Sequence, residues 1–243
     1  MKRRGFVKLC ASAVASVSAS PELLAEGARK LQTYERVKLI DHQTREPVRA
    51  SSLEVGEAYV FHYPYVTTPC FIIDLGRPVK ANGRLLTRDR ESYRWPGGSG
   101  PKHSVVSFSA ICAHKMSHPA PSVSFINYRH GRTSYRNNDE EIVESENVIY
   151  CCSERSVYDP ARGALVLGGP APQPLAAIAL DYVPEEDSFY ATATIGGEMF
   201  DRYFTTFGKR LVLDHERLDI HRAASGTADL IRLKDFSRKQ VMC

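Results

Sequence analysis

The 243-residue sequence has no run of roughly 18 or more apolar residues, so it offers no strong transmembrane span. It also lacks a stripe of basic residues interleaved with aromatic ones, which argues against nucleic acid as a partner. No internal repeat is present. With 43% apolar and 25% charged residues, the composition is that of an ordinary globular chain, long enough for one large or two small domains.

The N-terminus has the pattern of an export signal. Arg3 and Arg4 are followed by Phe6, by Lys8 and then by a weakly apolar run rich in Ala and Ser. This order is similar to a twin-arginine signal, which exports proteins that have already folded. We therefore expect residues 1–25 to be a signal or anchor, and the protein to be periplasmic or held at the periplasmic face of the inner membrane. The alternative is a merely basic N-terminus before a frayed helix.

The six cysteines raise the question of disulfides, as they would in any exported protein. Three of them are assigned elsewhere: Cys10 to the signal, Cys70 to an apolar strand and Cys243 to the chain terminus. Metal chemistry is the better use for the remaining three, which are Cys112, Cys151 and Cys152.

Two short motifs carry candidate metal ligands. The first is Cys112-Ala113-His114, which follows a strand pattern over residues 104–111. The second runs from residue 151 to 160 with the sequence CCSERSVYDP, and a GGPAPQP segment at 168–174 follows it. A strand that ends at a ligand can hold a metal loop rigidly.

Together these motifs resemble those of Rieske iron–sulfur proteins, over roughly residues 50–195. In that family a Cys-x-His loop and a Cys-x-x-His loop hold a 2Fe–2S cluster, with two cysteines on one iron and two histidines on the other. The resemblance implies that Cys112, His114 and Cys151 are three of the four ligands. Glu154 stands at the position of the second histidine.

The resemblance also covers residues around the ligands. It implies that Ser156 donates a hydrogen bond to a bridging sulfide and that Tyr158 donates one to a cysteine ligand. Such donors stabilise the reduced cluster, because reduction adds negative charge that they partly neutralise. The segment that contains Gly169 and Pro170 matches the proline loop that covers the cluster and limits the access of water.

Glu154 leaves three hypotheses open. Its carboxylate could ligate iron, as a harder and anionic donor that lowers the potential. His118 or His130 could supply the imidazole instead, with Glu154 as a hydrogen-bond acceptor beside the site. Alternatively, the cluster is lost or replaced by zinc held by Cys112, His114, Cys151 or Cys152, and Glu154. Cys152 fits poorly with Cys151, because adjacent side chains in an extended segment point to opposite faces.

Some Rieske proteins brace the two ligand loops with a disulfide. The corresponding positions here are Ser117 and Ser153, so both partners are absent together. The resemblance therefore predicts a coherent site without a disulfide.

Short strand patterns separated by turns predict an all-β fold, a Rieske-type antiparallel sandwich with an inserted cluster-binding subdomain. We expect the domain to span residues 38–200 and the subdomain to span about 112–175. Residues 201–243 are expected to form a tail that packs on the domain or extends from it. The aromatic spacing near residues 200–207 is helix-compatible and typical of core packing.

The resemblance implies electron transfer by a 2Fe–2S cluster, as a carrier or as the iron–sulfur subunit of an envelope oxidoreductase complex. The partner would be a redox protein or a larger oxidoreductase subunit, and the N-terminal segment allows membrane association. No helical segment after residue 175 supplies the two histidines and carboxylate of an aromatic-ring oxygenase. The alternative is a cluster-free or zinc-binding Rieske-fold structural subunit of an exported complex.

Overall fold

The computed structural model describes residues 30–243, so the predicted signal with Arg3 and Arg4 lies outside the described residues. Strands dominate this part of the chain, in the order β1 (Leu31–Asp41), β2 (Ala58–His62), β3 (Pro69–Asp74), β4 (Asn82–Leu86), β5 (Ser92–Trp95), β6 (Val105–Ser109), β7 (Ile126–Arg129), β8 (Thr133–Arg136), β9 (Ile142–Ser145), β10 (Val148–Cys151), β11 (Ser156–Asp159), β12 (Leu165–Gly168), β13 (Ala177–Val183), β14 (Ser188–Ile195) and β15 (Thr227–Arg232). The helices are α2 (Phe200–Asp214) and α3 (Leu233–Phe236), with short 3₁₀ turns at η2 (Ala50–Ser52), η3 (Pro160–Arg162) and η4 (Pro184–Glu186).

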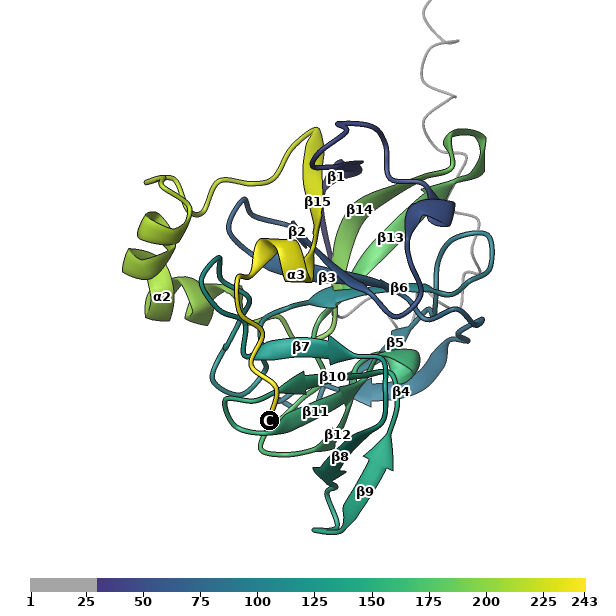
Figure 1. Cartoon of the computed structure of the whole chain (residues 1–243), viewed down its shortest axis with the longest axis vertical. Coiled ribbons are helices and arrows are strands. Elements are labelled where there is room, and N and C mark those ends of the chain that lie inside the picture. Colours follow the sequence, from purple (N-terminus) through teal and green to yellow (C-terminus); the bar gives the residue numbers. More distant parts are fainter. Residues whose placement is uncertain (1–29) are drawn as a thin grey trace, which may run out of the picture.

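Seven strands close a barrel in the order β1-β14-β13-β6-β3-β2-β15 (Figure 1). Strand β15 completes it, pairing in parallel with β1 and antiparallel with β2. The all-β prediction is confirmed, and the base closes as a barrel rather than as two open sheets. The segment beyond residue 200, expected as a tail, therefore contributes a strand to this barrel.

Strands β3 and β6 are buried on both faces, which explains why both are mainly apolar, and the buried Ser107 hydroxyl of β6 donates to the Phe71 carbonyl at 2.7 Å. In β3, Phe71 and Ile73 belong to one core cluster while Cys70 and Ile72 belong to another. This alternation follows from the period of two in a strand. One cluster fills the barrel, and the other joins the barrel to a smaller sheet.

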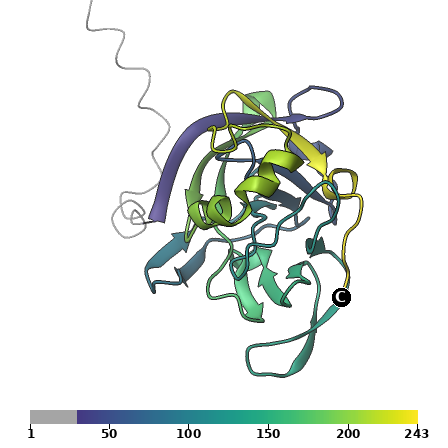
Figure 2. The ribbon, with the colours of Figure 1, turned by 90° about the vertical axis from the view of Figure 1, so that its left-hand side faces the viewer.

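The smaller sheet has the strand order β12-β11-β10-β7 and lies in the chain between β6 and β13 (Figures 1 and 2). Its strands are antiparallel, and Ile149 and Tyr158 contribute to the shared core cluster. Trp95 of the separate β4–β5 hairpin also packs there, with its ring 5.8 Å from that of Phe108. The core therefore extends to the place where the two candidate ligand loops meet.

Helix α2 packs its aromatic face inward, as the residue spacing predicts. Phe200, Tyr203 and Phe204 are buried in a cluster with Ile111 and Met116 of the first ligand loop. The helix thus supports that loop from one side. No helix within residues 30–243 is long and apolar enough to cross a membrane.

Candidate metal centre

The first loop turns sharply just after β6. The Cys112 N–H donates to the carbonyl of Ser117 at 2.9 Å, and the Met116 N–H donates to the carbonyl of Cys112 at 2.9 Å. The turn requires a left-handed backbone at Met116, where φ is 59°. Within it, the backbone N–H groups of His114 and Lys115 both donate to the Cys112 sulfur.

The second loop is the turn of the β10–β11 hairpin. Cys151 is the last residue of β10 and pairs with Ser156, the first residue of β11. The backbone N–H groups of Ser153 and Glu154 donate to the Cys151 sulfur. The amide donors favour the thiolate form of each cysteine, but the hydrogen bond with Cys112 and burial outweigh them at Cys151 and raise its pKa, so the negative charge is held on Cys112.

The two sulfurs meet in the interior. Cys112 and Cys151 are 1% and 0% exposed, and their side chains hydrogen-bond to each other. The hydrogen bond from Cys151 is the main cause that lowers the pKa of Cys112. The Tyr158 hydroxyl lies 3.2 Å from the Cys112 sulfur and accepts the Ala113 N–H at 3.2 Å. The Ala113 N–H donates to the oxygen of the Tyr158 hydroxyl. The hydroxyl proton is therefore free to point at the Cys112 sulfur.

A second pair of candidate ligands lies beside the thiols. The pKa of Glu154 is lowered mainly by its hydrogen bond with Lys115, then by the charge of Lys115, with a smaller contribution from His114. Nδ1 of His114 is buried and has no hydrogen-bond partner among residues 30–243. An imidazole nitrogen in that position is suited to metal ligation.

Lys115 connects the two loops through this carboxylate. Its ammonium lies 2.6 Å from Oε1 of Glu154, and the two side chains are 63% and 35% exposed. Oε2 of Glu154 makes no hydrogen bond within the described chain. One carboxylate oxygen thus remains available for a metal.

Ser156 and the proline loop enclose the thiol pair. The Ser156 hydroxyl is buried without a partner among the described residues, as it would be if its acceptor were an inorganic sulfide. Gly169 has φ of 82°, and a Cβ there would lie 2.3 Å from the Arg155 carbonyl oxygen. Only glycine allows this approach, which brings exposed Pro170 and its neighbours against the second ligand loop.

The alternative ligands lie elsewhere. Nδ1 of His118 is 2.9 Å from the Met116 carbonyl oxygen, and its ring packs edge-on against Tyr203 and Phe207 at 4.8 and 4.9 Å. His118 thus belongs to the α2 cluster. His130 is exposed, and its Nδ1 is 2.7 Å from Oδ1 of Asn147.

The register of β7 and β10 rules out His130 as a ligand. Cys151 pairs with Ile126 and Val148 pairs with Arg129, so His130 lies beyond the opposite end of the ladder. Four residues of strand separate Asn147 from Cys151, which is roughly 13 Å at the usual rise. Since His130 lies beside Asn147, it is too far from Cys151 for the two residues to bind the same metal centre.

Cys152 forms a disulfide with Cys243. Two predictions are therefore wrong: Cys152 cannot be an alternative ligand, and the site does have a disulfide beside it. The Cys152–Cys243 bond involves the residue that follows the ligand candidate Cys151. The disulfide of some Rieske proteins would instead join the positions that Ser117 and Ser153 occupy here. Four cysteines remain once Cys112 and Cys151 are assigned to metal, so the sequence alone did not single out this pairing.

The donors among residues 30–243 do not form a site for a single metal ion. Within residues 30–243, no three His, Cys, Asp or Glu side chains converge as a single metal ion requires. A zinc site takes three or four such ligands. A Rieske-type cluster takes only two per iron, and the Cys112–Cys151 and His114–Glu154 pairs offer that set.

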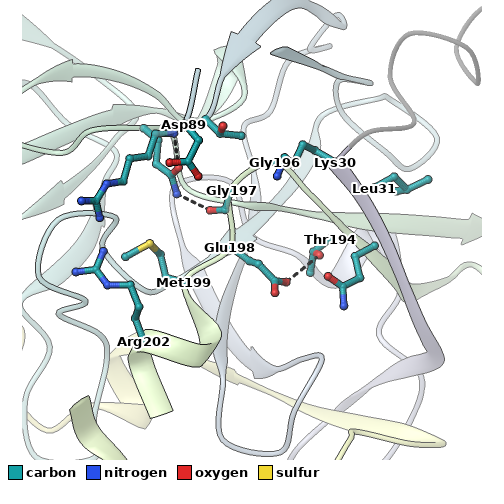
Figure 3. Close-up of a pocket in the computed structure, with 13 residues that line it drawn as sticks. Lys30, Leu31, Asp89, Thr194, Gly196, Gly197, Glu198, Met199 and Arg202 are labelled. Carbon is teal, nitrogen blue, oxygen red and sulfur yellow. Dashed lines mark hydrogen bonds between the residues drawn. The ribbon is translucent and has the colours of Figure 1, made fainter. Parts of the chain in front are cut away.

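A pocket of about 610 Å³ lies beside the proline loop (Figure 3). None of its described lining residues is a candidate ligand, and it holds charges of both signs from Lys30, Arg88, Asp89, Glu198 and Arg202. Gln173 of the proline loop bridges it, accepting the Arg88 N–H at 2.7 Å and donating to the Gly197 carbonyl at 2.6 Å. These bonds fix the proline loop between the turn of the β4–β5 hairpin and the segment that follows β14 of the barrel.

Known proteins give limited guidance. No protein-family model matches the chain. Among solved structures, the chain is similar to the soluble domain of the Rieske protein II (soxF) from Sulfolobus acidocaldarius, at 23% sequence identity and a TM-score of 0.44. The match covers 68% of this chain and 82% of that chain.

Proposed function

We propose that the chain is an electron-transfer protein that holds a Rieske-type 2Fe–2S cluster. Cys112 and Cys151 would bind one iron, and His114 and Glu154 would bind the other. The observation that carries this proposal is the meeting of one buried cysteine from each loop, Cys112 and Cys151, beside the Tyr158 hydroxyl, with the unpartnered Nδ1 of His114 and the free Oε2 of Glu154 on the same two loops of the described chain. The bound cluster supplies a one-electron couple.

The chain's own residues prepare the site for negative charge. Four backbone N–H groups donate to the two sulfurs, and Tyr158 adds a hydroxyl at 3.2 Å from one of them. Burial of both cysteines excludes water, which strengthens each of these interactions. The enclosure favours a carrier, or a subunit that passes electrons to a redox partner, over a site that binds a substrate.

Metal analysis tests this proposal. Protein purified anaerobically should be brown and contain about two irons and two acid-labile sulfides per chain. Cys112→Ala should lose both, whereas Cys70→Ala should keep them because Cys70 lies in the barrel core. A colourless wild-type protein, or one that holds a single zinc ion, would contradict the proposal.

A cluster-free structural subunit is the second candidate, and the Glu154–Lys115 ion pair favours it. A solvent-exposed carboxylate whose charge is already balanced by an ammonium group gains less from binding a metal. In that case the purified chain would fold without iron, and the Cys112→Ala variant would differ from it only in stability.

Tyr158→Phe is expected to lower the midpoint potential while the cluster stays bound. The ring would keep its packing in the shared core, but the hydrogen bond to the Cys112 sulfur would be lost. Less stabilisation of the added electron means a lower potential. A redox titration followed by visible absorption measures this, and an unchanged potential in a loaded variant would show that the hydroxyl does not act on the cluster.

Export is expected to depend on Arg3 and Arg4. We propose a periplasmic location, or attachment to the periplasmic face of the inner membrane, which the Cys152–Cys243 disulfide supports because such bonds persist in oxidising compartments. Replacing both arginines with lysine should leave the folded protein in the cytoplasm. Cell fractionation measures this, and unchanged export of the variant would remove the targeting proposal.

A further inference from the structure

The last residues of the chain leave α3 and run across the smaller sheet, as the yellow segment in Figure 1 shows. We call residues 237–243 the C-terminal clasp. Its backbone pairs with the segment that continues the first ligand loop, through Arg238 N–H to Pro121 O at 3.0 Å, Ser124 N–H to Lys239 O at 2.8 Å and Val241 N–H to Ser124 O at 2.8 Å. The Ser237 hydroxyl also donates to the Ala120 carbonyl at 2.7 Å.

The clasp ends in a covalent bond to the second ligand loop. Cys243 is bonded to Cys152, with their Cα atoms 5.7 Å apart. The Cys152 N–H donates to the Phe125 carbonyl at 2.7 Å, which ties the loop to the start of β7 as well. The clasp therefore connects both ligand loops, and Cys152 is directly bonded to the ligand candidate Cys151.

Arg129 holds the end of the clasp in place. Its guanidinium donates to the Cys243 carbonyl and to the Cys152 sulfur, both at 3.0 Å, and stacks on the ring of Tyr150 at 4.1 Å. Residues on β7 and β10 thus hold the guanidinium beside the disulfide. An arginine held by stacking loses little freedom when it makes these bonds.

We infer that the C-terminal clasp positions the Cys151 loop and that the disulfide locks it there after export. This inference rests on the proposed function, since it assigns the clasp to the cluster loops. When the bond forms, the thiols of Cys152 and Cys243 give up two electrons and two protons to a protein or small-molecule disulfide, which is cleaved to two thiols. The cytoplasm keeps thiols reduced, so the non-covalent contacts would form first and the bond would follow in the periplasm.

The positioning role is tested on the full chain after a chelator has removed metal. N-Ethylmaleimide reacts with free thiols, and mass spectrometry gives the rate at each cysteine. Relative to Cys70 in the barrel core, Cys151 should react about tenfold faster or more in Cys152→Ser/Cys243→Ser, because the loop opens locally. Met242→Ala is the matched control: the exposed residue precedes Cys243, and its loss leaves the bond intact.

Wild-type chain reduced with dithiothreitol supplies the same comparison without a mutation and should reproduce the faster reaction of Cys151. A rate at Cys151 that rises no more than the rate at Cys70 would overturn the inference, because the disulfide would then act only through the stability of the whole fold. This readout needs no cluster. A wild-type protein without iron would refute the proposed function while the alkylation result still decided the role of the clasp.

The order of events is tested with the lysine variant of Arg3 and Arg4 that stays in the cytoplasm. Rapid acid quenching and alkylation should find Cys152 and Cys243 as thiols there and as a disulfide in exported protein. A complete bond in the cytoplasmic protein would overturn closure after export.

Discussion

Glu154→Gln is expected to purify without its cluster, and Glu154→His is expected to bind one at a higher potential. A neutral amide is a poor iron ligand, so the glutamine variant leaves one iron with only His114 from the protein. Histidine at the same position would give that iron two imidazoles, as in the Rieske ligand set. Replacing an anionic donor with a neutral one stabilises the reduced state, so the midpoint potential rises. Iron analysis and a redox titration measure both effects.

Two controls separate Glu154 from its neighbours. Lys115→Met removes the cationic partner at 2.6 Å but keeps the carboxylate, so it should retain the cluster. His130→Ala should also retain it, because that residue lies beyond the far end of the β7–β10 ladder. A brown Glu154→Gln protein together with a colourless His118→Ala protein would show that His118 is the fourth ligand.

Loss of the disulfide is expected to destabilise the fold strongly. Cys152 and Cys243 are 91 residues apart in sequence, so their bond closes a long loop and restricts the unfolded chain. Removal of such a native bond typically costs about 2–5 kcal/mol. For a chain of this size that corresponds to a fall in Tm of about 5–15 °C. Thermal unfolding of Cys152→Ser/Cys243→Ser, with Met242→Ala as control, measures it.

Reductant provides an independent check on this second prediction. Dithiothreitol should lower the Tm of the wild-type protein to that of the double variant and leave the variant unchanged. If wild type and variant unfold at the same temperature without reductant, the clasp does not contribute to stability.

The sequence predicts the strands and the loops better than it predicts their partners. The apolar strand around Cys70 and the aromatic spacing of α2 are local patterns, and both segments are buried as predicted. Strand β15 was missed because its position in the barrel depends on β1, almost 190 residues earlier in the chain, and no local period encodes such a pairing. The same limitation hid the bond between Cys152 and Cys243, since connectivity cannot be read from cysteine spacing.

The candidate site shows the same division. The resemblance to Rieske proteins implies that Cys112, Cys151 and Tyr158 lie together, and the Tyr158 hydroxyl does lie 3.2 Å from the Cys112 sulfur, which is also hydrogen-bonded to Cys151. Spacing could not show that Lys115 would pair with Glu154, or that His118 would face α2. Those contacts depend on how two loops and a helix meet in three dimensions.

Pulsed electron paramagnetic resonance on the reduced protein tests the central claim most directly, because it counts the histidine nitrogens bound to the cluster. With ¹⁵N-labelled histidine in an otherwise ¹⁴N protein, the account predicts strong coupling to one imidazole nitrogen, lost in His114→Ala if any cluster remains. Coupling to two imidazole nitrogens would contradict ligation by Glu154. A reduced protein with no cluster signal, or with no coupled histidine nitrogen, would contradict the assignment of a Rieske-type site.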